Sequence, residues 1–149
     1  MDYYQQVVSI YPESPIADDV LFNMTQIYQL HTDKWEQAIS AYSQFASLFP
    51  KHQQAQNAQL NIAEIYCQKD KWELALTAFH GFLEKYPRHQ IGDAVSFRIA
   101  DIYKFKLKDE TKATGLYQNL INSYPNSSWA ALAKQRLTQP NQGETQHEK

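Results

Sequence analysis

The chain has 149 residues, of which 43% are hydrophobic and 13% aromatic, so it can bury a sizeable core within the size of one domain. Glycine is scarce at 4 residues while Ala, Leu, Gln, Lys and Glu are common, which favours an all-α protein. The formal net charge of -2, with no stretch that concentrates Lys and Arg, disfavours nucleic acid as a partner.

Membrane and disulfide signals are weak. No stretch reaches the roughly 18 consecutive apolar residues of a membrane span, so we expect no direct membrane insertion. The N-terminal residues lack the basic start and long apolar run of a signal peptide. The single cysteine, Cys67, excludes an internal disulfide and a multi-cysteine metal site, but it leaves the compartment open.

Four aromatic-proline pairs divide the chain at nearly equal intervals. They are Tyr11-Pro12, Phe49-Pro50, Tyr86-Pro87 and Tyr124-Pro125, with successive prolines 38, 37 and 38 residues apart. An aromatic residue lies eight positions before each proline, and Ala or Gly lies five positions after it. This regular spacing indicates a tandem array.

Each repeat predicts a pair of helices. The second helix carries one apolar stripe at i, i+4, i+7 and i+11, as in Ala38, Tyr42, Phe45 and Phe49, and the following proline ends it. The segment after each proline, such as 14–30, is the first helix of the next pair. Short polar stretches at 31–33, 68–70 and 106–109 then turn the chain. We therefore expect an α-solenoid of stacked antiparallel helix pairs, with about eight helices.

Residues 1–137 are predicted to form this repeat domain. It contains a half repeat at 3–12, repeats at about 13–50, 51–87 and 88–125, and a closing helix at 127–137 that starts at the N-cap Ser127. Residues 138–149 have no apolar side chain other than proline and are expected to be a disordered tail.

The N-terminal half repeat has the stripe of a second helix with no first helix before it. Its apolar residues are Tyr4, Val7, Val8 and Tyr11. Such a face indicates either an excised domain or a contact with another chain or parent domain. We favour excision, because exposed end faces are usually capped in intact arrays.

The pattern resembles the tetratricopeptide repeat (TPR) family over residues 3–137. That family's unit of about 34 residues is shorter than the repeat here, and its turn glycine is missing. The phrases YPESPIADDV and YPNSSWAALAKQRL are most similar to bacterial envelope members of the BamD and YbgF (CpoB) type. The resemblance implies a periplasmic or cell-envelope location, with a cytoplasmic one left open, and a role in outer membrane assembly.

The resemblance also implies a concave wall, lined by the first helix of each repeat, that holds a partner protein or peptide. The implied inner-facing positions are Phe22, Gln26 and Gln29 in the first full repeat, Leu60, Glu64 and Cys67 in the second, and Phe97, Asp101 and Lys104 in the third. Phe22, Leu60 and Phe97 form an apolar column. Helical spacing leaves open whether this column lines the groove or packs against the neighbouring second helix.

The sequence lacks motifs that are typical of a metal site or a catalytic site. No two of the five histidines have the i, i+4 spacing of a metal-binding pair, and no motif places a basic partner beside Cys67. Trp35 and Trp72 share one repeat column and are expected to pack rather than to stack on a ligand.

We predict no catalytic, cofactor or metal site and a non-enzymatic scaffold that binds a protein. The alternative is a structural or self-assembly module that associates through its N-terminal helix face, so homo-oligomers stay an open alternative.

Overall fold

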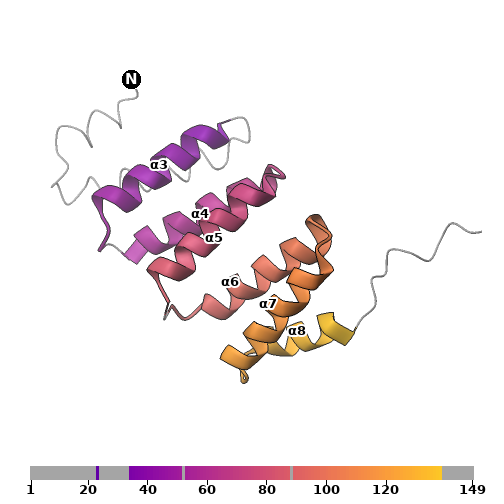
Figure 1. Cartoon of the computed structure of the whole chain (residues 1–149). Coiled ribbons are helices and arrows are strands. Elements are labelled where there is room, and N and C mark those ends of the chain that lie inside the picture. Colours follow the sequence, from indigo (N-terminus) through magenta and orange to yellow (C-terminus); the bar gives the residue numbers. More distant parts are fainter. Residues whose placement is uncertain (1–22, 24–33, 52, 88, 139–149) are drawn as a thin grey trace, which may run out of the picture. The chain divides into compact units, whose positions relative to one another are not determined.

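The structure, a computed structural model, describes residues 23, 34–51, 53–87 and 89–138. Every element in these residues is helical (Figure 1): α3 (Trp35–Leu48), α4 (Gln53–Gln68), α5 (Trp72–Lys85), α6 (Gly92–Asp101), the π-helical η1 (Ile102–Lys106), α7 (Glu110–Ser123) and α8 (Ser128–Thr138). The prediction of an all-α fold is confirmed. Several predicted features lie outside the described residues, namely the half repeat at 3–12 with Tyr4, Val7, Val8 and Tyr11, the groove positions Phe22, Gln26 and Gln29, and the tail at 139–149.

The described helices belong to two compact units that divide between Tyr86 and Pro87. In the first unit, α4 packs against both α3 and α5. In the second unit, α6 packs against α7, and α8 packs against both of them. Each unit therefore builds its own core from helices that follow one another in the chain.

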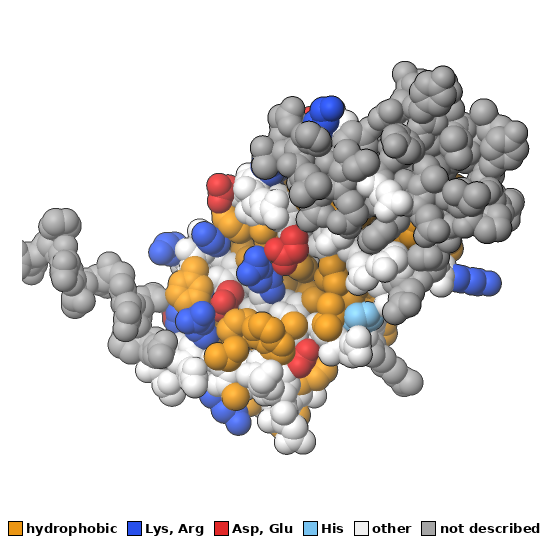
Figure 2. Space-filling view, turned by 180° about the vertical axis from the view of Figure 1, so that it is seen from behind, with side chains coloured by type: hydrophobic (Ala, Val, Ile, Leu, Met, Phe, Trp, Pro, Cys, Tyr) orange, Lys and Arg blue, Asp and Glu red, His pale blue; other side chains and the backbone are white. Residues whose placement is uncertain are grey.

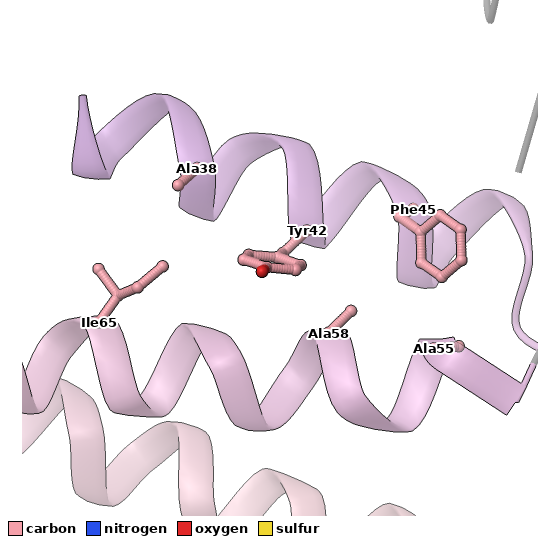
Figure 3. Packing of buried hydrophobic residues seen from close by; sticks show 6 residues of the cluster. All are labelled: Ala38, Tyr42, Phe45, Ala55, Ala58 and Ile65. Atoms are coloured by element: carbon pink, nitrogen blue, oxygen red, sulfur yellow. The ribbon is translucent and has the colours of Figure 1, made fainter. Parts of the chain in front are cut away.

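Large rings and alanines alternate in the core of the first unit. Tyr42 and Phe45 of α3 are fully buried, and their rings lie between the two helices beside Ala55 and Ala58 of α4 (Figure 3). Because an alanine has only a methyl group, the helices can approach closely and the neighbouring ring fills the space. The apolar stripe predicted from the sequence is thus the packing face of α3.

The aromatic-proline pairs end the second helix of each pair. The N–H groups of the C-cap residues Phe49, Tyr86 and Tyr124 donate to the carbonyl oxygens of Phe45, Phe82 and Leu120 at 2.9, 2.8 and 2.9 Å. The proline that follows has no N–H to continue this series. The helix ends therefore fall where the repeat pattern predicts them.

An aspartate takes the place of glycine in the turn from α4 into α5. Asp70 has a φ of 54°, in the left-handed region, which aspartate occupies more readily than most residues. The Lys71 N–H donates to the Tyr66 carbonyl at 2.9 Å and the Asp70 N–H to the Cys67 carbonyl at 3.2 Å, which is the hydrogen-bond pattern of a Schellman motif. The turn closes without the glycine of the repeat family.

The corresponding stretch of the second unit contains one additional residue. The interval from the repeat tyrosine to the repeat alanine is nine residues for Tyr66 and Ala75 and ten for Tyr103 and Ala113. The π-helical η1 accommodates the insertion, with the Leu107 N–H donating to the Ile102 carbonyl five residues back at 3.1 Å. This insertion explains why the repeat prolines Pro87 and Pro125 are 38 residues apart, whereas Pro50 and Pro87 are 37 apart.

Replacement of a buried ring should lower the stability of the first unit. Phe45→Ala removes a fully buried side chain and leaves a cavity between α3 and α4, so the free energy of unfolding should fall by about 3–5 kcal/mol. Denaturant unfolding followed by circular dichroism measures the loss. Leu48→Ala on the same helix is the control, because Leu48 is 42% exposed and its truncation should change stability little. Equal losses in the two variants would contradict this account of the core.

Candidate functional site

In the first unit, the predicted groove positions follow one another along α4. Leu60, Glu64 and Cys67 are spaced i, i+4 and i+7, so they share one side of this helix. Leu60 and Glu64 are partly buried, whereas Cys67 is only 8% exposed. Leu60 and Glu64 therefore offer more surface to a partner than Cys67 does.

In the second unit, Phe97 lies in the core. Its side chain is 6% exposed and belongs to a cluster with Ala100 and Ala133. The centroid of its ring is 5.8 Å from that of Tyr117 and 5.2 Å from that of Trp129. Of the two alternatives that the sequence leaves open for this residue, the geometry favours packing.

Asp101 connects the three helices of the second unit through its carboxylate. Its Oδ1 atom accepts a hydrogen bond from the Tyr117 hydroxyl of α7 and lies 3.4 Å from Nε of Arg136 in α8. Burial raises the pKa of Tyr117 well above its usual range, and the hydrogen bond to the Asp101 carboxylate raises this pKa further. Asp101, which is partly buried, thus connects α6 with α7 and α8.

Lys104 is the one buried charged residue among the described residues, at 5% exposure. Its ammonium donates to the Arg136 carbonyl at 2.8 Å and lies 3.2 Å from Oε1 of Glu110. The Arg136 carbonyl is in the last turn of α8, where carbonyls have no partner within the helix and a cation is favourable. Lys104 therefore anchors the C-terminal end of α8, rather than presenting its charge on an open wall.

Next to these two anchors, apolar and cationic side chains reach the surface together. The Arg136 guanidinium carbon lies 5.0 Å from the centroid of the Phe105 ring and 6.0 Å from that of Phe97, and the Phe97 ring in turn contacts Trp129. Leu132 lies between Trp129 and Arg136 on α8, one turn from each. We call these residues the aromatic-arginine strip: Phe97, Phe105, Trp129, Leu132 and Arg136.

Exposure sets the strip apart from the rest of the described surface. The large apolar side chains that are exposed are Leu48, Leu74, Phe105, Trp129 and Leu132, at 42, 47, 39, 36 and 40%. Three of these five belong to the strip, and Figure 2 shows apolar side chains reaching one face of the molecule between charged ones. An apolar group of this kind beside a cation is typical of a binding surface.

Of the predicted groove positions, only Phe97 belongs to the strip; Trp129, Leu132 and Arg136 lie on α8, which the sequence predicted only as a closing helix. In the structure, Trp129 is 36% exposed and Arg136 lies against two phenylalanine rings. The spacing of Trp129, Leu132 and Arg136 at i, i+3 and i+7 is the signal that could have identified a shared face.

The part of the chain that the structure describes contains no cluster of three His, Cys, Asp or Glu side chains able to hold a metal ion. Among the same residues, no helix is both long and apolar enough to cross a bilayer.

Removal of the Tyr117 hydroxyl should weaken the second unit and change its response to alkali. Tyr117→Phe leaves Asp101 without its neutral donor, so the free energy of unfolding should fall by about 1–2 kcal/mol. Because the pKa of Tyr117 is raised on folding, its contribution to stability is complete below the ordinary tyrosine pKa of about 10 and is lost as the pH rises above that value.

Unfolding by denaturant at a series of pH values measures both effects. Tyr124→Phe, at a partly buried tyrosine of the same unit, is the control. An unchanged alkaline profile in Tyr117→Phe would refute the role assigned to the hydroxyl.

Loss of the Lys104 charge should loosen α8. Lys104→Met keeps the apolar stem but removes the hydrogen bond to the Arg136 carbonyl and the ion pair with Glu110, so we expect a loss of about 1–3 kcal/mol. Amide hydrogen exchange should become faster in α8. Lys134→Met, at an exposed lysine of α8, should leave exchange unchanged, and equal rates in the two variants would show that Lys104 does not anchor the helix.

In structure, the chain is similar to solved proteins built from TPR-like repeats. It matches the TPR-like repeats of a kinesin light chain of Podosopora anserina with a TM-score of 0.63 and 15% identity, over 90% of this chain and 72% of that one. It matches a tetratricopeptide repeat protein of Parabacteroides merdae with a TM-score of 0.62 and 20% identity, over 88% of this chain and 48% of that one. At such identities the likeness shows the fold alone, and the α-solenoid fold class is confirmed.

In sequence, no curated protein matches the chain. The family model YfiO, described as outer membrane lipoprotein, matches residues 27–148, which is most of the chain. This match bears out the resemblance to BamD-type TPR proteins, which are non-enzymatic interaction scaffolds. The chain therefore belongs to the YfiO family of outer membrane lipoproteins.

Proposed function

We propose that the chain binds a partner protein in a cell-envelope assembly complex, and that the aromatic-arginine strip is a principal contact surface. The family supports a role in protein-protein interaction and suggests the envelope as its setting. The aromatic-arginine strip is the surface that we propose for this interaction. Its residues come from α8, from α6 and from η1, which continues α6. These are first helices of their repeats, the helices that line the binding wall of solenoids.

The observation that carries this proposal is the exposure of Trp129, Leu132 and Phe105 around a fixed arginine. Tryptophan and arginine are the residues that most often dominate the binding energy of protein interfaces. Each of the three apolar side chains is 36 to 40% exposed, so a partner could remove substantial apolar surface from water. Asp101 contacts the Arg136 guanidinium and Lys104 donates to the Arg136 carbonyl. These contacts hold Arg136 in place before a partner binds, which reduces the entropic cost of binding.

The α4 positions Leu60 and Glu64 are proposed as a second contact in the first unit. Both are partly exposed on the first helix of their repeat, and they combine an apolar side chain with a carboxylate. The remaining groove positions Phe22, Gln26 and Gln29 stay predictions from the resemblance.

Photocrosslinking in the cells that produce the protein tests the proposal. A photoreactive amino acid at Leu132 of the full chain should give crosslinks to an envelope protein, identified by mass spectrometry, because this side chain would be covered by the partner. The same amino acid at Lys134, which is exposed on α8 outside the strip, is the matched control and should give little product. The proposal fails if Leu132 gives no product with an envelope protein, or if both positions give the same products in equal yield.

A further inference from the structure

We infer that the aromatic-arginine strip binds an acidic partner segment in which Asp or Glu side chains alternate with large apolar ones. This inference rests on the proposed function and specifies the chemistry of the partner. Three features of the second unit carry it: the state of the Arg136 guanidinium, the exposed apolar side chains near it, and the charge balance of the unit.

Arg136 is held in place but retains hydrogen-bonding capacity. Its Nε atom lies 3.4 Å from Oδ1 of Asp101, and its guanidinium carbon lies over the rings of Phe105 and Phe97. Within the described residues, its Nε is buried and has no hydrogen-bond partner. The side chain is still 38% exposed. A guanidinium in this state can pair with an incoming carboxylate through two parallel N–H donors.

Exposed apolar side chains accompany the guanidinium. Its carbon lies 5.0 Å from the centroid of the Phe105 ring, and Leu132 and Trp129 lie one and two turns before Arg136 on the same side of α8. A carboxylate that binds Arg136 would therefore have apolar side chains of the strip nearby. A segment with apolar residues next to the acidic one would cover the strip, and exclusion of water would strengthen the ion pair.

The charge of the second unit favours an acidic partner. Between residues 89 and 138 there are seven basic side chains and four acidic ones, although the whole chain has a net charge of -2. The basic residues are Arg98, Lys104, Lys106, Lys108, Lys112, Lys134 and Arg136. The local excess is positive and attracts anionic partners.

All four carboxylates of this stretch already have partners inside the unit. Asp93 accepts from the Ser127 hydroxyl, Asp101 from the Tyr117 hydroxyl, and Asp109 from the Lys112 N–H at the start of α7, while Glu110 pairs with Lys104. The acidic side chains of this stretch are therefore engaged within the fold.

Fluorescence anisotropy with synthetic peptides tests the inference. The probe is a labelled peptide that alternates Glu with Leu and Phe. One matched peptide replaces Glu by Gln, and another replaces Leu and Phe by Ala. We expect the full chain to bind the acidic-apolar peptide at least about tenfold more tightly than either matched peptide, with affinity falling as salt is added.

Variants of the chain locate the binding. Arg136→Gln and Leu132→Ala should each weaken binding of the acidic-apolar peptide by about tenfold. Lys134→Gln removes the same charge from the same helix outside the strip, and Leu74→Ala truncates an equally exposed leucine of the first unit, so both should bind like the parent chain. Leu132→Ala changes an exposed side chain and keeps the test decisive if Arg136→Gln does not fold.

Four outcomes would overturn the inference. The first is equal binding of the Glu and Gln peptides, and the second is equal weakening by Arg136→Gln and Lys134→Gln. The third is that no peptide binds. The fourth is that the chain binds instead to vesicles of phosphatidylglycerol and phosphatidylcholine, and that Arg136→Gln and Leu132→Ala abolish this binding. Failure of the peptides together with crosslinking at Leu132 to an envelope protein would reject the partner chemistry and leave the proposed function in place. Peptide binding without any such crosslink would reject the envelope role instead.

Discussion

The fold depends on the packing of aromatic rings against alanines across neighbouring helices. Tyr42 and Phe45 lie against Ala55 and Ala58 in the first unit, and Tyr117 lies with Ala100 and Ala133 in the second. A helix pair of this length buries too little apolar surface to be stable alone, so a third helix completes the core within each unit. The spacing of rings and small residues in the sequence therefore has to be kept from repeat to repeat, and this requirement produces the periodic columns.

The two units differ in the interactions that hold their helices together. The described core of the first unit is made of apolar side chains, from Tyr42 and Phe45 on α3 to Ile65 on α4. The second unit adds a polar network in which Asp101, Lys104 and Arg136 join α6, η1 and α8. Because Lys104 is buried and donates to the Arg136 carbonyl, and Asp101 lies beside the Arg136 guanidinium, these groups fix the position of α8 more specifically than apolar contacts alone. A surface that is held in this way is pre-organised for recognition.

Much of the fold could be predicted from residue spacing, because the packing of adjacent helices is local in sequence. The helix ends at Phe49, Tyr86 and Tyr124 follow from the prolines after them, and the buried face of α3 follows from the spacing of its apolar stripe. The sequence signal for the π-helical η1 is the one additional residue in the interval from Tyr103 to Ala113. Its conformation could not be predicted, since an inserted residue can equally lengthen a turn.

The sequence by itself determined the fold class and the helix ends before the repeat prolines, because these depend on the period of apolar residues and on proline. Only the tertiary structure decided which side chains of the helices reach the surface. Phe97 is buried because Trp129 and Tyr117, 32 and 20 residues further along the chain, contact its ring, and Arg136 is exposed beside it because Asp101 and two phenylalanine rings hold it there. A helical period specifies the direction of each side chain from its own axis, whereas its exposure depends on what the neighbouring helices place against it.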